Sequence, residues 1–315
     1  MSTETAAPTD AAKPSSPPYR RRIADRDGAL AWIFLLPSVV YIVALVAVPF
    51  VLAIAFAASD VTAGDPSFDF VGLTNFARVL DDPVFWRSLG NTFVFTGISM
   101  VLIVVFGKVL ANILVADFRG KWIVRFCVLL PWTTPVALSS ISWLWLLDSI
   151  YSPIDWLLRA VGLLGPGENM YWLGEPGLAM TSVITVHVWR LTPLAAVIMM
   201  AGLVAIPRDI EEAARVDGAG YWRRMFEVTV PMVMPVIAVA ALFGAIFTFT
   251  DMAVVRVLTR GGPNDATQVL SSWAFYRGIE GGDVAQGAAV ALFLFPLLLA
   301  AAVAILRAVR RIEVR

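Results

Sequence analysis

Six long apolar runs dominate the chain and restrict what it can fold into. A helix needs about 20 apolar residues to cross a bilayer core of about 30 Å, and the runs are continuous rather than alternating, which predicts helices and not barrel strands. We therefore expect an all-α integral membrane protein with six transmembrane helices, the first of them kinked at Pro37 and Pro49. The expected spans are Ala29–Ser59, Asn91–Ala116, Ile123–Leu147, Leu178–Ile206, Pro231–Val255 and Ala288–Val309.

The composition agrees with this expectation and excludes several functions. The 315 residues are 59% hydrophobic and 15% charged, whereas soluble domains are about half apolar and about a quarter charged. The net charge is zero, so no overall field favours nucleic acid. One His and one Cys exclude a His-rich metal cluster and an intrachain disulfide, and Cys127 is expected to be a small buried hydrophobe. No catalytic group, metal site or cofactor is predicted.

The Lys and Arg residues predict an orientation. Residues 1–28 are rich in Ala, Pro, Ser and Thr, end in an Arg cluster, and are expected to form a disordered tail. With six spans, this cluster lies on the same side as the basic loops after the second and fourth spans and the basic C-terminus. Because such residues concentrate on the cytoplasmic side, both termini are predicted to be cytoplasmic. The membrane domain is then 29–309, and 310–315 form a cytoplasmic end.

A charged segment, residues 207–230, lies between the fourth and fifth spans. Pro207 suits the start of a helix, and Asp209, Glu211 and Glu212 suit its positive end. The glycines of "DGAG" predict a turn. A second helix over Tyr221–Thr229, with one apolar face, is expected to end at Pro231. The compact helix–turn–helix predicted here is suited to docking a partner.

Within this segment, "EAARVDGAGYWRRMFEVTVP" resembles the coupling-loop signature of bacterial ABC-importer permeases of the carbohydrate-uptake type. The similarity extends over roughly Ala29 to Val309, and "LTRGGPNDATQVLSSWAFYRGIEGGDVAQGAA" is similar to the first of two partner permeases. The resemblance implies the type I importer fold in the plasma membrane. The positions it assigns to ATPase coupling are Glu211, Glu212, Ala213, Ala214, Asp217, Gly218 and Ala219.

The resemblance also implies partners. They are a homodimeric ABC ATPase that binds and hydrolyses ATP, a second permease subunit, and an extracytoplasmic solute-binding protein that delivers a mono-, di- or oligosaccharide. The chain has no Gly-rich Lys-Ser/Thr phosphate loop of its own. It is therefore expected to be a transport subunit in membrane lipid and not an enzyme.

Polar residues inside the spans are candidates for substrate contact, because such residues are costly in a bilayer. The expected pathway residues combine an aromatic face with hydroxyl, carboxylate and guanidinium groups. Arg190 has the alternative of pairing with a carboxylate, and His187 is a weaker candidate for substrate contact. Lys108 is expected to snorkel or to pair with Asp117. Asn112 is expected to form a hydrogen bond between helices. The pathway residues are Trp189, Arg190, Thr248, Thr250 and Asp251.

Other functions stay open at this stage. A glycerol-3-phosphate or polyol importer would have near-identical motifs, although a phosphate substrate favours more basic residues within the spans. An ion-gradient-driven carrier predicts inverted repeats, and the chain has no clear internal repeat. An intramembrane enzyme needs a nucleophile with a base, or a ligand cluster, which a single His and a single Cys in different spans do not supply.

Overall fold

The computed structural model describes residues 21–65 and 67–313, and the chain divides into two units, before and after Leu52. The first unit holds α1 (Arg21–Ile42), the π-helical turn η1 (Val43–Ala47) and the start of α2 (Val48–Ala57). The helix therefore begins inside the segment expected to be a tail, of which residues 1–20 lie outside the described part.

The first span is continuous through its prolines. Pro37 lies inside α1, and η1 directly precedes Pro49. There the Val48 N–H donates to the Val43 carbonyl, five residues back, which accommodates the proline's missing N–H. Trp32 and Phe34 are 68% and 78% exposed. Apolar side chains of this helix are therefore not covered by other residues of its own unit.

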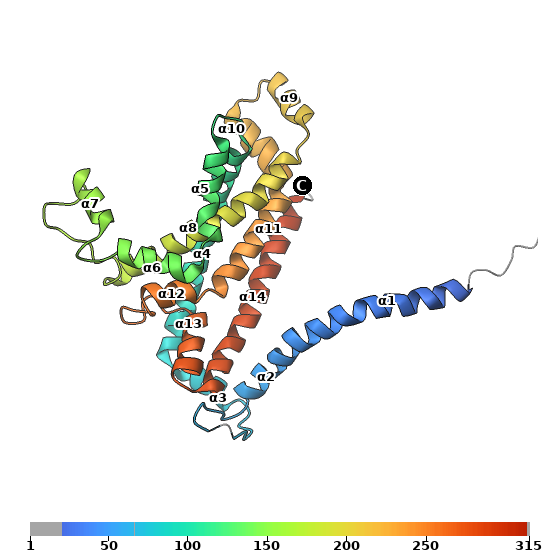
Figure 1. The fold of residues 1–315 in the computed structure, drawn as a ribbon, viewed down its shortest axis with the longest axis vertical. Coiled ribbons are helices and arrows are strands. Elements are labelled where there is room, and N and C mark those ends of the chain that lie inside the picture. Colours follow the sequence, from blue (N-terminus) through green and yellow to red (C-terminus); the bar gives the residue numbers. More distant parts are fainter. Residues whose placement is uncertain (1–20, 66, 314–315) are drawn as a thin grey trace, which may run out of the picture. The chain divides into compact units, whose positions relative to one another are not determined.

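The second unit is a helical bundle with short helices at both ends (Figure 1). Its long helices are α4 (Pro83–Val115), α8 (Pro176–Val204), α11 (Val230–Phe249) and α14 (Val284–Glu313). The shorter elements are α3 (Thr74–Asp81), α5 (Lys121–Thr133), α6 (Val136–Leu146), α7 (Pro153–Ala160), α9 (Arg208–Val216), α10 (Tyr221–Arg224), η2 (Met225–Thr229), α12 (Ala253–Leu258), α13 (Leu270–Phe275) and η3 (Tyr276–Glu280).

Helix α8 is the most buried of the candidate spans, and α4 packs along it more extensively than any other helix pair in the described residues. A methyl group on Gly107 of α4 would lie 3.0 Å from the Ala195 Cβ of α8. Small residues on both helices therefore permit the close approach. The core around this contact includes Phe95, Ile103 and Met199, each with no exposed surface.

The third predicted span is broken rather than straight. Helices α5 and α6 meet at an angle of 99°. The cause is local: Thr134, which precedes Pro135, takes an extended conformation with ψ 136°, as residues before proline prefer. The expectation of one continuous helix over Ile123–Leu147 is therefore wrong at Thr134.

The predicted boundary at Pro231 is also wrong. Helices α10, η2 and α11 form one continuous span, Tyr221–Phe249. The Val230 N–H donates to the Met225 carbonyl, five residues back, and this π turn accommodates Pro231 as η1 accommodates Pro49. The second helix of the charged segment is consequently the first part of a span.

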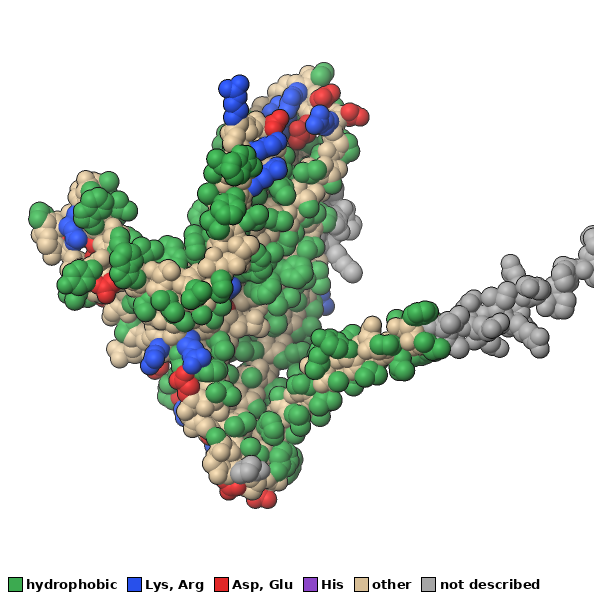
Figure 2. All heavy atoms as spheres, viewed as in Figure 1, with side chains coloured by type: hydrophobic (Ala, Val, Ile, Leu, Met, Phe, Trp, Pro, Cys, Tyr) green, Lys and Arg blue, Asp and Glu red, His purple; other side chains and the backbone are tan. Residues whose placement is uncertain are grey.

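Among the described residues, five helices are long and apolar enough to cross a membrane, or six if the bent pair counts as one span. Apolar side chains cover the visible sides of the second unit, and charged ones gather near the ends (Figure 2). Cys127 on α5 is exposed, so the expectation that it is buried is wrong: it borders an open apolar cavity instead of packing into the core.

Candidate functional site

Helix α9 forms as its charges predict. Asp209 and Glu211 occupy its first turn and Arg215 its last, where they complement the helix dipole. The helix ends in a left-handed turn at Gly218, with φ +77°. The Gly218 N–H donates to the Arg215 carbonyl and the Ala219 N–H to the Ala214 carbonyl, both at 3.0 Å. This is the bond pattern of a Schellman cap, which favours glycine.

The α9 segment presents charged and apolar groups that the rest of the described chain leaves free. Glu212 is exposed and has no side-chain partner among residues 31–65 and 67–307, whose side chains the structure describes. Val216 is 88% exposed and Trp222 67% exposed, although both are apolar. Charged side chains gather on the surface around α9 and α10 (Figure 2). Exposed apolar side chains beside charged ones are typical of protein-binding surfaces.

A second group of polar residues is buried between α8 and the end of α11. The Arg190 Nη2 lies 2.8 Å from the Asp251 Oδ2, and the His187 Nδ1 lies 3.4 Å from the same oxygen. The His187 Nε2 lies 2.9 Å from the Thr248 hydroxyl. Because that hydroxyl donates to the Gly244 carbonyl, it accepts the bond from Nε2.

The cluster fixes the turn that joins α11 to α12. The Asp251 Oδ1 accepts from the Val254 N–H at 3.0 Å, and the Asp251 carbonyl accepts from Ser271 at 2.7 Å. Every oxygen of Asp251 thus has a partner within the chain. Of the predicted pathway residues, the structure brings together Arg190, Thr248 and Asp251, with Arg190 paired to a carboxylate as its alternative predicted.

The other two pathway residues lie apart from this cluster. Trp189 is 39% exposed and packs edge-on against Trp143, with ring centroids 5.5 Å apart. It lines an apolar cavity of about 650 Å³ together with Thr185 and Cys127. Thr250 is exposed, and its hydroxyl donates back to the Ile246 carbonyl.

The sequence predicts that Lys108 either snorkels or pairs with Asp117. The pair with Asp117 does not form, and Lys108 donates to the Asn112 side chain at 2.7 Å. Asn112 therefore bonds within α4 rather than between helices. Asp117 binds Lys121 at 2.8 Å, which lowers the pKa of the Asp117 carboxyl below its usual value.

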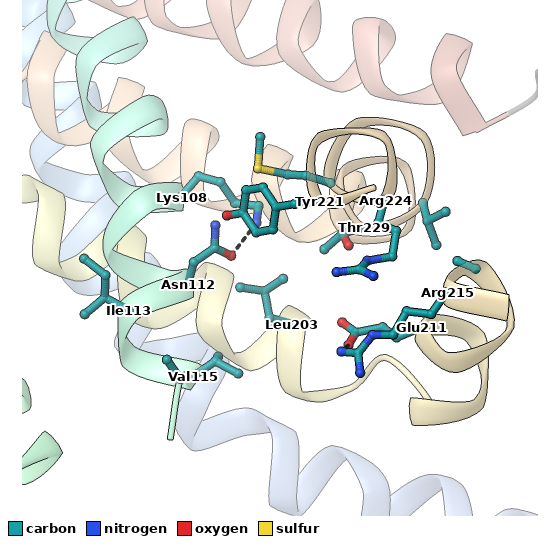
Figure 3. Close-up of a pocket in the computed structure, with 14 residues that line it drawn as sticks. Lys108, Asn112, Ile113, Val115, Leu203, Glu211, Arg215, Tyr221, Arg224 and Thr229 are labelled. Atoms are coloured by element: carbon teal, nitrogen blue, oxygen red, sulfur yellow. Dashed lines mark hydrogen bonds and ion pairs between the residues drawn. The ribbon is translucent and has the colours of Figure 1, made fainter. Parts of the chain in front are cut away.

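Lys108 and Asn112 line a cavity beneath α9 (Figure 3), and Arg224 lines it as well. Spacing alone gave no sign that Arg224 would join them.

An all-helical bundle whose long apolar helices can span a bilayer, with an exposed charged helix between two of them, defines a polytopic membrane protein. The chain belongs to the family described as the inner membrane component of binding-protein-dependent transport systems, whose model matches residues 103–314. It is thus a multi-pass inner membrane protein and a permease subunit of an ABC importer, not the subunit that performs catalysis.

Several relatives carry names that specify their transport systems. The MalF permease of a trehalose/maltose system from Thermococcus litoralis is 32% identical over 275 residues, covering 87% of this chain and 91% of that protein. The SmoG permease of a sulfoquinovosyl glycerol system from Agrobacterium fabrum is 29% identical over 296 residues, covering 93% and 94%.

A solved structure extends the comparison to the fold. A chain of a bacterial alginate ABC transporter, in complex with an alginate pentasaccharide-bound periplasmic protein, matches with a TM-score of 0.79 at 19% identity. The match covers 93% of this chain and 98% of that one. The predicted importer-permease fold is confirmed.

Proposed function

We propose that the chain is the membrane permease of an ATP-driven sugar importer, with α9 as the segment that docks the ATPase. The observation that carries the docking role is the exposed surface of α9, where Glu212 has no partner among the described side chains and Val216 is almost fully exposed. The names of the trehalose/maltose and sulfoquinovosyl glycerol relatives support a carbohydrate substrate.

The partners and orientation follow from this assignment. An ATPase homodimer binds ATP on the cytoplasmic side, where α9 and both termini lie. A second permease covers the spans' exposed apolar faces, and an extracytoplasmic solute-binding protein delivers the sugar. In α9, Ala213 and Ala214 permit close approach and the Gly218 cap fixes the helix end. Asp217 and Ala219 flank Gly218 in this turn, and Glu211 and Glu212 lie earlier, within α9.

Trp189 and Thr250 are the residues we propose for sugar contact. The half-exposed Trp189 offers a flat apolar face of the kind that suits a sugar ring, and Thr250 offers an exposed hydroxyl group. Arg190, Thr248 and Asp251 act as the frame that positions these residues, since Arg190 pairs with Asp251 and Thr248 bonds His187 and the Gly244 carbonyl. Arg190 is neutralised by Asp251, which favours a neutral sugar over glycerol-3-phosphate.

The experiment that tests the docking role is charge reversal at Glu212. In Glu212→Lys, we expect the permease to reach the membrane in normal amounts while sugar uptake and stimulated ATP hydrolysis fall at least about tenfold, because one charge-assisted contact is worth about 1.5–3 kcal/mol. Uptake of labelled sugars by cells and ATP hydrolysis by the purified complex are the measurements.

The matched control is Asp117→Lys, in the loop between α4 and α5. Asp117 is 92% exposed and its pair with Lys121 is a surface pair, so its loss changes stability little. Both substitutions add the same charge, on the side we propose to be cytoplasmic. Normal uptake in Glu212→Lys, or an equal loss in Asp117→Lys, contradicts the assignment of α9.

A further inference from the structure

The open cavity beneath α9 is lined by four parts of the second unit, which are α4, α8, α9 and the start of the Tyr221–Phe249 span. It has a volume of about 480 Å³, within the range of sites for small ligands. Figure 3 shows Lys108 and Asn112 reaching it from α4, and Arg215 and Arg224 from the α9 and α10 side. Leu203 and Ile113 contribute apolar surface. The walls therefore combine converging cations with a place for an organic body.

The charges in this cavity are not balanced by the described chain. Lys108, Arg215 and Arg224 face one carboxylate, that of Glu211, whose Oε2 lies 3.9 Å from the Arg215 Nη2. Lys108, half-buried on a membrane span, bonds the neutral Asn112, and the Arg224 guanidinium has no side-chain partner among residues 31–65 and 67–307. A partly buried cation without a counter-ion is costly.

We propose that this cavity binds a phosphate group, as part of an anionic metabolite or of a lipid headgroup. Arg224 supplies a planar fork that matches phosphate oxygens, and Lys108 supplies a compact charge at the opposite wall. The Asn112 amide and the Tyr221 and Thr229 hydroxyl groups, which line the same space, are further donors. The ligand neutralises the two cations that the chain leaves unpaired.

Such a ligand regulates coupling, because it joins α9 to α4. Glu211, Ala214 and Arg215 of α9 line the cavity on one side, and Lys108 and Asn112 of α4 line it on the other. A bound phosphate contacts both elements and restrains α9 relative to the span. This consequence relies on the proposed docking role of α9, whereas the binding itself does not.

The test measures binding by the full-length chain in nanodiscs, without ATP. Inorganic phosphate is titrated by calorimetry in phosphatidylcholine nanodiscs, and retention of phosphatidylglycerol from mixed-lipid nanodiscs is measured by native mass spectrometry. Lys108→Met and Arg224→Gln remove the two unpaired charges, and each is expected to weaken binding about tenfold or more.

Arg223→Gln is the matched control, because Arg223 is already paired with Glu227 at 2.8 Å and does not line the cavity. Its binding should equal that of the wild type. Phosphate binding that depends on Lys108 and Arg224 supports a free anion as the ligand, and phosphatidylglycerol retention with the same dependence supports a lipid. If neither probe depends on the two residues while the variants keep their helical content, the proposal is overturned.

Discussion

At the scale of single residues, Asp251 holds the end of α11 in place. Its carboxylate accepts from Arg190 and from the Val254 N–H, and its carbonyl accepts from the Ser271 hydroxyl. The side chain of Asp251 is 4% exposed and that of Arg190 15% exposed. At such a site, removing one charge of the pair destabilises the protein, because a lone buried ion is far more costly than a paired one.

We therefore predict that Asp251→Asn destabilises the protein by about 3–5 kcal/mol, the usual cost of breaking a buried pair from one side. Chemical denaturation of the purified chain in detergent measures the loss, and Asp117→Asn, at an exposed pair, is the control. Removing both charges in Asp251→Asn with Arg190→Gln should cost less than the sum of the single changes.

A different outcome has a clear interpretation. If Asp251→Asn leaves the free energy of unfolding unchanged but raises the sugar concentration needed for half-maximal uptake, then Asp251 contacts substrate. In that case its pair with Arg190 positions a ligand group rather than the α11–α12 turn.

At the scale of elements, the segment 259–268 is fastened to α4. The Asn91 amide donates to the carbonyls of Asp265 and Gln268, and the Arg87 guanidinium donates to that of Asn264. Gly261 makes this path feasible: its φ is +86°, and an added Cβ would overlap the Gln268 side chain. Only glycine meets both requirements.

Gly261→Ala is expected to detach this segment from α4, since alanine is strained at this φ and Gln268 must move. Limited proteolysis of the purified protein should show new cleavage between 259 and 268, with a lower midpoint of thermal unfolding. Gly90→Ala, at an exposed helical position with no atom within 4 Å of the added Cβ, should be neutral or slightly stabilising. Equal behaviour of the two variants contradicts the role of Gly261.

Helix positions were predictable from the sequence, but breaks were not. Hydropathy located the spans because apolar length is a property of the residues themselves. Proline was ambiguous: before Pro49 and Pro231 a π turn keeps the helix continuous, whereas at Thr134–Pro135 the chain turns through 99°. The residues that precede Pro49 and Pro231 stay helical, whereas Thr134 before Pro135 is extended. Similarly, the charge pattern predicted α9, because that pattern is local. The pairing of Arg190 with Asp251 in particular and the cavity beside Lys108 were not predicted, because they join residues far apart in sequence.

At the scale of the whole molecule, much of the apolar surface of the second unit is uncovered. Phe93 and Phe126 are 51% and 61% exposed, and Cys127 lies beside an apolar cavity. These surfaces suit lipid and a second permease subunit. The single cysteine is also useful, because Cys127→Ala produces a chain without thiols.

In that background, single cysteines test the proposed orientation. Asp117→Cys lies in the loop between α4 and α5, and Ala160→Cys at the end of α7, both exposed. A membrane-impermeant maleimide added to intact spheroplasts should label position 160 and not 117, and inside-out vesicles should give the reverse. Labelling of 117 from outside contradicts a cytoplasmic α9 side.

The continuity of Tyr221–Phe249 has a mechanical consequence. At 1.5 Å per residue, these 29 residues form a rod about 43 Å long. One end begins directly after α9 and the Gly218 cap, and the other stops at the turn held by Asp251. Because Tyr221–Phe249 is one uninterrupted span, we expect a displacement of α9 to be carried along it to the turn that Asp251 holds.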